Sequence, residues 1–250
     1  MGKIPIALQL YSVREDAKED LPGVLEQVAG MGYQGVEFAG FYGWEAEEIR
    51  SMLDDNGLVC CGSHQGIDTL LGDELLKTAE FNATLGNPFL ICPGLPEEYR
   101  DSRDAWAKTA DLFNEIAERL RPMNLWTGYH NHFHEFTEMD GELPWDTFFS
   151  NTDSDIVMQL DTGNALKGGG EITQFLERYP ARALTVHVKE FSEGEGKPVV
   201  GEGDTDWDRV FELCETVGAT RWYIVEQESY AYEPLECVER CLQNLREMGK

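Results

Sequence analysis

The chain is poor in positive charge and has no long apolar run, and each deficit excludes a class of function. The sequence has 20 Lys and Arg residues and 47 Asp and Glu residues, which gives a formal net charge of −27. This charge repels a phosphate backbone and argues against nucleic acids and membrane surfaces as partners. No stretch approaches the roughly 18 to 20 apolar residues of a membrane span, and the first residues do not resemble a secretory signal. We therefore expect a soluble, cytoplasmic protein.

Two other common features are missing. The six cysteines show no zinc-site spacing and lie mostly in apolar or helical stretches, which is typical of buried free thiols in a reducing compartment. No Pro/Ser-rich linker or low-complexity tract divides the chain. Because 250 residues can bury one large core, we predict a single domain over residues 1–250.

Short apolar runs alternate with helical periodicity along the whole chain. Predicted strands cover residues 6–12, 35–40, 58–64, 88–94, 125–132, 156–164, 183–191 and 222–228. Predicted helices cover residues 20–31, 44–55, 73–85, 103–120, 144–149, 172–178, 207–217 and 235–248. Eight strand-helix units indicate an α/β fold of the (β/α)8 TIM barrel type. An open doubly wound sheet is disfavoured because no GxGxxG follows the first strand.

Potential metal ligands lie at the ends of the last four predicted strands. The segment GYHNHFHEF at 128–136 holds three of the five histidines, and His130 lies near the end of the fifth strand. Asp161, His187 and Glu226 lie at or near the ends of the next three. In a parallel barrel these strand ends meet at one rim, and imidazoles with carboxylates are the usual ligands of a divalent metal.

At this point the sequence resembles the xylose-isomerase-like TIM barrels of the sugar phosphate isomerase/epimerase type, in a subgroup that carries YHNHxxEF. The resemblance covers essentially the whole chain, through ALQLYSVR, GYQGVEFAG, GYHNHFHEF, QLDTGN, HVKEF, GEGDTDW and IVEQE. It implies one divalent metal, most often Mn²⁺, with Mg²⁺, Co²⁺ or Zn²⁺ as alternatives. Dimers and tetramers are common in this family, so a homo-oligomer is compatible with the resemblance.

The resemblance also implies a ligand set, and this chain departs from it at one position. Family members use Glu, Asp, His and Glu, and the last three match Asp161, His187 and Glu226. Where many members have a glutamate on the fifth strand, this chain has His130. Either His130 binds the metal, or His132 or Glu135 reaches it from the following turn. The departure puts in doubt an epimerase mechanism that uses two opposed glutamates.

Further residues are candidates for catalysis or substrate binding. Glu226 is the first choice for a combined base and ligand, and Lys189 is a candidate oxyanion contact or acid, with a salt bridge to Glu190 or Glu228 as the alternative. His132 and Glu135 are expected as orienting or hydroxyl-binding groups. The predicted substrate contacts are Gln9, Tyr11, His64 and Asn164.

These expectations favour a metal-dependent sugar isomerase or epimerase that transfers a proton next to a carbonyl. The substrate would be a ketose, a keto-sugar or a polyol-derived ketone, preferably unphosphorylated because no cluster of Arg and Lys suggests a phosphate site. A lyase or dehydratase acting on a keto-sugar or keto-inositol is the nearest alternative. A catalytically silent sugar-binding barrel is the second, and an endonuclease is disfavoured by the acidic charge.

Overall fold

The computed structural model describes residues 2–194 and 196–250, which contain a closed barrel of eight parallel strands in sequence order. The barrel closes because β1 pairs with β8 as well as β2, with Leu8 opposite both Val36 and Val225. The strands are β1 Ile6–Gln9, β2 Gly35–Ala39, β3 Val59–His64, β4 Phe89–Cys92, β5 Trp126–His130, β6 Val157–Asp161, β7 Thr185–Val188 and β8 Trp222–Val225. The predicted (β/α)8 TIM barrel is confirmed.

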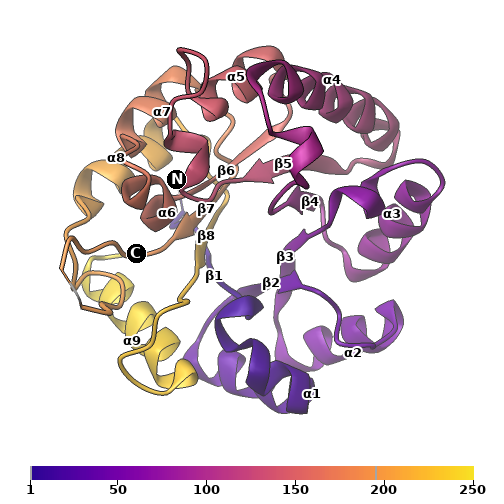
Figure 1. Cartoon of the computed structure of the whole chain (residues 1–250). Helices are drawn as coiled ribbons and strands as arrows, with labels where there is room; N and C mark the ends of the chain where they lie inside the picture. Colours follow the sequence, from indigo (N-terminus) through magenta and orange to yellow (C-terminus); the bar gives the residue numbers. More distant parts are fainter. Residues whose placement is uncertain (1, 195) are drawn as a thin grey trace.

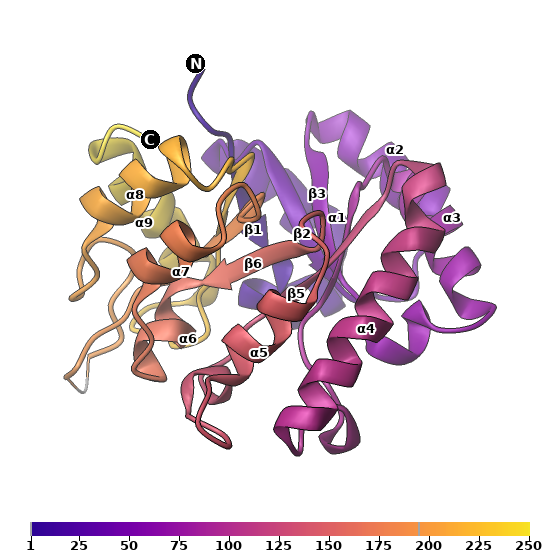
Figure 2. The same ribbon diagram turned by 90° about the horizontal axis from the view of Figure 1, so that it is seen from above.

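Helices surround the strands (Figure 1). They are α1 Arg14–Met31, α2 Ala46–Asn56, α3 Glu74–Leu85, α4 Arg103–Leu120, α5 Pro144–Asn151, α6 Thr162–Lys167, α7 Ile172–Arg178, α8 Trp207–Thr216 and α9 Pro234–Glu247. Seen from above, both chain ends lie at the same edge of the molecule (Figure 2). None of the helices in the described part of the chain combines the length and hydropathy needed to cross a bilayer.

The first helix begins earlier than the sequence predicts. We expected a helix from residue 20, whereas α1 starts at Arg14 and is interrupted at Asp20, where φ is −149° and ψ is 77°. The Asp20 carboxylate accepts a hydrogen bond from the backbone N of Gly23 at 3.0 Å. This contact caps a second helical segment, so the predicted start coincides with a kink.

The sixth strand was predicted too long. Residues 162–164 were expected to be extended, but they form the start of α6. The backbone N of Asn164 donates to Oδ1 of Asp161 at 2.6 Å, so Asp161 caps this short helix. The strand therefore ends at Asp161, and its side chain lies at the rim.

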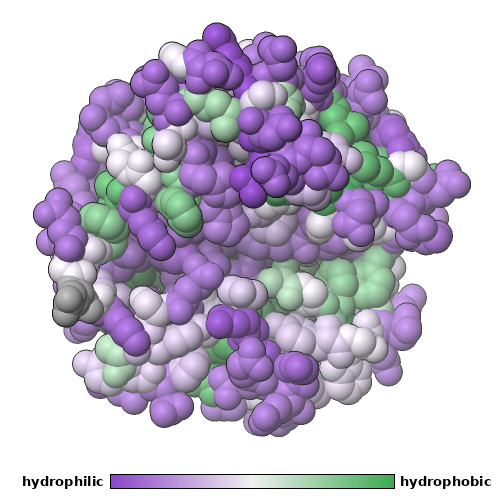
Figure 3. Space-filling model, in the orientation of Figure 1, coloured by the Kyte–Doolittle hydropathy of each residue, from purple (hydrophilic) through white to green (hydrophobic). Residues whose placement is uncertain are grey.

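Side chains alternate between the outer shell and the barrel interior. In β2, Val36 and Phe38 pack in the apolar shell between strands and helices, so Glu37 between them points inward. A smaller apolar cluster of Phe89, Ile91 and Val157 is separate from this main core. The face viewed in Figure 3 is hollowed near its centre, where hydrophilic residues predominate.

Candidate metal centre and active site

Four side chains from successive strands meet inside the barrel rim. His130 and Asp161 are the last residues of β5 and β6, His187 lies in β7, and Glu226 directly follows β8. One potential ligand atom from each lies within 4.8 Å of the others, and all four residues are buried. The structure thus brings together the four residues that the sequence placed at strand ends.

The spacing within this group leaves donor atoms without partners. Nδ1 of His187 lies 2.7 Å from Oε2 of Glu226 and 3.9 Å from Oδ2 of Asp161. Nε2 of His130 lies 4.0 Å from the same glutamate oxygen. Oδ2 of Asp161 and Nδ1 of His130 are buried and lack a hydrogen-bond partner among the described residues. Two imidazoles and two carboxylates with an unpaired buried oxygen fit a divalent cation.

Buried charges in this group perturb one another. Burial alone would lower the pKa of His187, but the carboxylates of Glu37 and Glu226 raise it to about 10. Burial raises the pKa of Asp161 to about 7, and the charge of Glu226 adds to this effect. Burial alone would raise the pKa of Glu226, but Lys189 and His187 hold this pKa well below the usual value. Protons therefore occupy, in part, the place that a cation would take.

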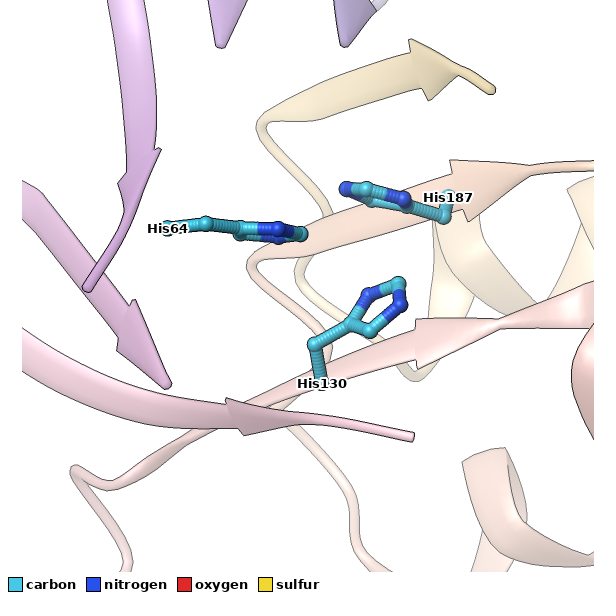
Figure 4. A group of neighbouring side chains, drawn as sticks. All are labelled: His64, His130 and His187. Carbon is cyan, nitrogen blue, oxygen red and sulfur yellow. The ribbon is translucent and has the colours of Figure 1, made fainter. Parts of the chain in front are cut away.

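A third imidazole faces the group. His64, at the end of β3, points toward His130 and His187 (Figure 4), and potential ligand atoms of the three lie within 4.8 Å of one another. The rings of His64 and His187 are nearly parallel, with centroids 5.4 Å apart. Burial lowers the pKa of His130 well below its usual value, and the neighbouring histidines add to this effect. His130 is therefore a neutral ring that can donate a lone pair.

Glu37, which the sequence analysis missed, lies directly beneath these rings. Its carboxylate is fully buried, and Oε2 accepts from Nε2 of His187 at 2.6 Å and from Nε2 of Gln9 at 2.8 Å. Oε1 accepts from Nε2 of Gln159 at 2.8 Å. Burial would raise the pKa of Glu37, but the imidazoles of His64 and His187 hold it below the usual value. A single acid inside the apolar run GVEFAG was the only sequence signal for it.

A cavity of about 390 Å³ opens above the group. This volume lies within the roughly 300–1,000 Å³ typical of small-molecule sites. Its lining is mostly histidine, carboxylate and small or aromatic groups: Tyr11, Ala39, His64, Pro93, Gly94, His130, His132, Glu226 and Glu228. Tyr11 and His64, two of the predicted substrate contacts, thus line the cavity.

His132 and Glu135 take different places. His132 lines the cavity, and its buried Nδ1 lacks a hydrogen-bond partner among the described residues. Glu135 is fully buried, and its carboxylate accepts from the Tyr129 hydroxyl at 2.6 Å and from the backbone N of His132 at 2.9 Å. The carboxylate closes the turn after β5 and is not part of the group of four ligands. Glu135 is therefore placed as an orienting group that holds the His132 backbone, and its role in catalysis stays a prediction.

Lys189 adjoins the group through a pair of carboxylates. Its Nζ forms an ion pair with Glu228 and lies 3.9 Å from Oδ2 of Asp161. Burial would lower the pKa of Lys189, but Asp161, Glu226 and Glu228 raise it well above the usual value. The salt bridge expected as the alternative is thus present, with Glu228 as its partner. The ammonium group also faces the candidate ligands, and its role as an acid or oxyanion contact stays a prediction.

Two predicted substrate contacts are engaged elsewhere. Gln9 is fully buried, its amide N bonded to Glu37 and its Oε1 accepting the backbone N of Tyr11 at 3.0 Å. The Asn164 side chain donates to the backbone O of Asn131 at 3.3 Å, and its backbone N is capped by Asp161. Both residues therefore support the site's framework, and Gln9 does not line the cavity.

Comparison with known proteins gives a consistent picture. The family model of the xylose isomerase-like TIM barrel matches residues 25–248. An inosose dehydratase of Erwinia tasmaniensis is 24% identical over 244 residues, which cover 82% of this chain and 81% of that protein. A sugar phosphate isomerase/epimerase of Parabacteroides distasonis superposes with a TM-score of 0.85 at 23% identity, over 98% of both chains. A 3-keto-D-glucoside 4-epimerase of E. coli superposes with a TM-score of 0.72 at 17% identity, over 98% of this chain and 100% of that chain.

Proposed function

Because this chain belongs to the xylose isomerase-like TIM barrel family, we propose that it is a metal-dependent lyase that acts on a neutral keto-sugar or keto-cyclitol. In the proposed reaction the proton next to the carbonyl is removed and a β-hydroxyl is expelled. The observation that carries this proposal is the placement of Glu226 at the cavity and within the group of four candidate ligands, with His130 where family members resembling this chain have a second glutamate.

The proposed metal centre consists of His130, Asp161, His187 and Glu226. A divalent ion bound there would polarise the substrate carbonyl and stabilise the enediolate that forms after proton removal. Mn²⁺ is the expected ion, and Zn²⁺ or Co²⁺ competes well because two of the four donors are imidazoles.

The protein's own groups divide the proton transfers. Glu226 is ionised because its pKa is held low, so it can accept the α-proton on the side of the cavity that it lines. Lys189 stays protonated and offers its N–H groups to the departing hydroxyl or to the developing oxyanion. Burial lowers the pKa of His132, so its neutral ring can accept a hydrogen bond from a substrate hydroxyl.

The charge of the site favours an uncharged substrate. No Arg or Lys is among the cavity-lining residues, which include the carboxylates of Glu226 and Glu228. The nearby Lys189 is already paired with Glu228 and faces Asp161. A phosphate group would meet these carboxylates, and the lining residues supply no guanidinium or ammonium group to offset them. The relative from Erwinia is an inosose dehydratase, and an inosose is an uncharged cyclitol ketone, which agrees with this preference.

The decisive experiment follows deuterium and product together. The metal-loaded protein is incubated in deuterated water with an inosose, a 3-keto-glucoside and a ketose phosphate, and proton NMR monitors α-proton loss and formation of the dehydrated product. We expect elimination with one or both neutral ketones and none with the phosphate. Glu226→Gln should abolish α-proton loss, and Lys189→Met should slow elimination more than exchange.

Epimerisation or isomerisation is the second candidate, favoured by the names of the structural neighbours. It requires a second proton carrier on the opposite face of the substrate, and His132 is one group at the cavity that can act in this way. Exchange with inversion and without elimination would support this candidate against the lyase. Metal binding without exchange on any ketone would contradict both and favour a sugar-binding barrel.

A further inference from the structure

We propose that Glu37 is a positioning residue that fixes which ring nitrogen His187 and His64 present to the cavity. The inference goes beyond the proposed reaction and rests on the proposed metal centre only in its first part, the route to His187. The second part, the route to His64, concerns a cavity-lining residue and holds with or without a metal.

The direct route is the hydrogen bond to His187. Nε2 of this ring donates to Oε2 of Glu37 at 2.6 Å, and both side chains are fully buried. Nδ1 consequently faces the candidate ligands, at 2.7 Å from Glu226 and 3.9 Å from Asp161. A histidine that binds a metal usually donates its other N–H to a carboxylate or carbonyl, which sets the ring's orientation and raises its basicity. Glu37 meets this requirement for Nδ1 of His187.

The second route passes through Gln159 and acts beside a longer direct contact, 3.4 Å, between Oε2 of Glu37 and Nε2 of His64. The amide N of Gln159 donates to Oε1 of Glu37 at 2.8 Å and to Oγ1 of Thr185 at 3.0 Å. Because a carboxylate only accepts, the amide cannot turn its oxygen toward Glu37. Oε1 of Gln159 therefore faces Nε2 of His64 at 2.8 Å, and this ring nitrogen must carry the proton. Nδ1 of His64 is left as the unprotonated nitrogen of a ring that lines the cavity.

The position of Glu37 is itself enforced by its surroundings. Gln9 donates to Oε2 from the neighbouring strand, and a Cβ at Gly62 on the other neighbouring strand would overlap Oε1 of Glu37. The strand pairing places Gln9 beside Glu37 and Glu37 beside Gly62. A carboxylate that is fully buried with its acceptor sites filled by three side-chain donors is costly to displace. It can therefore hold two rings in one arrangement.

The matching variant is Glu37→Gln, which keeps the side-chain length but replaces one acceptor oxygen by a donor amide. The new amide and that of Gln159 would then oppose each other, so Gln159 turns and offers its N–H₂ to His64. We expect Zn²⁺ affinity, measured by calorimetry, to fall by about 10- to 100-fold. Nitrogen NMR of histidine-labelled protein should show His64 protonated on Nε2 alone in the wild type and on both nitrogens in exchange in the variant.

Two further variants separate the routes. Gln159→Met removes the relay to His64 but leaves the bond between Glu37 and His187 and the 3.4 Å contact between Glu37 and His64. The preference of His64 for a proton on Nε2 should therefore weaken, while Zn²⁺ affinity stays near the wild-type value. Thr127→Val is the matched control, because the Thr127 hydroxyl is buried in β5 without a hydrogen-bond partner among the described residues. It should change neither readout.

The outcomes distinguish this inference from the proposed function. Wild-type His64 protonated on Nδ1 would overturn the relay, even if Glu37→Gln failed to fold. A folded Glu37→Gln protein with wild-type Zn²⁺ affinity and unchanged tautomers would show that Glu37 only fills the barrel. If the wild type bound no divalent metal, the proposed function would fail, while the His64 tautomer would still decide whether Glu37 positions a cavity residue.

Discussion

Nδ1 of His187 lies 2.7 Å from Oε2 of Glu226, so the two residues form an ion pair at the point where a divalent cation would sit. Glu37 holds the other side of the same ring at 2.6 Å. The imidazole is thus enclosed by two carboxylates. Whatever binds at this rim must compete with the proton on Nδ1.

That competition predicts proton release on metal binding. The raised pKa of His187, about 10, means that its ring carries an extra proton at neutral pH, and binding of Zn²⁺ or Mn²⁺ must remove it. We expect about one proton released near pH 8, and apparent affinity that rises with pH up to about 10. Calorimetry in buffers of different ionisation enthalpy measures both. Binding without proton release would contradict the assignment of His187 as a ligand.

The same pair makes metal-free stability depend on pH. The pKa of His187 in the folded protein lies above the usual histidine value of 6.5. Its contribution to the free energy of unfolding is therefore fully present below about pH 6.5 and is lost as pH rises toward about 10. We expect the thermal midpoint of the metal-free protein to fall across this window. His187→Gln should flatten this decline, and an equally steep decline in that variant would assign it to other groups.

Asp161→Asn should abolish or strongly weaken metal binding. The unpartnered Oδ2 of Asp161 is the anionic donor that the substitution removes, whereas Oδ1 can still cap α6 through the backbone N of Asn164. Circular dichroism should therefore show a folded barrel, while elemental analysis after dialysis against Mn²⁺ shows little metal. Full metal content in this variant would refute the ligand assignment.

His130→Ala should also weaken metal binding, because it removes the fifth strand's contribution to the four-ligand group. The informative companion is His130→Glu, which replaces an imidazole by the carboxylate found at this place in family members resembling the chain. We expect the affinity ratio of Mn²⁺ to Zn²⁺ to rise by about tenfold, since hard oxygen donors favour Mn²⁺. Unchanged affinities in His130→Ala would move the ligand role to His132.

Gly62→Ala tests the space that Glu37 occupies. The new Cβ would overlap Oε1 of Glu37, so we expect a loss of about 1–3 kcal/mol in the free energy of unfolding together with weaker metal binding. Gly30→Ala is the control, because nothing lies within 4 Å of its Cβ and it is a residue of α1. Removing a helical glycine should stabilise the protein by about 0.5–1 kcal/mol. Denaturant unfolding compares the two.

The four candidate ligands could be predicted because their position follows from strand order alone. The apolar strands of a parallel barrel end at the rim. Polar residues at the ends of such runs, here His130, Asp161 and Glu226, can therefore be recognised as candidate ligands in the sequence. The motif resemblance pointed to the same residues. The fold and this candidate ligand set could therefore be predicted without knowledge of any long-range contact.

Glu37 could not be found in this way because its role depends on pairing across the barrel. It lies 28 residues from Gln9, 122 from Gln159 and 150 from His187, and each of these partners is an unremarkable polar residue or a ligand within its own strand. The short helix α6 was not predicted from the sequence, for a related reason. Its six residues are too few for a periodic pattern, and it is started by the cap from Asp161.

The hydroxyl of Tyr129 joins the outer aromatic shell to the turn that carries His132. Its ring contacts Trp106 and Phe148 among the helices, while its oxygen donates to Glu135, which in turn holds the His132 backbone. A change of ring size in that distant layer would therefore be transmitted to an imidazole at the cavity. Variants with altered substrate preference can be sought at Trp106 and Phe148, which are not among the residues that line the cavity.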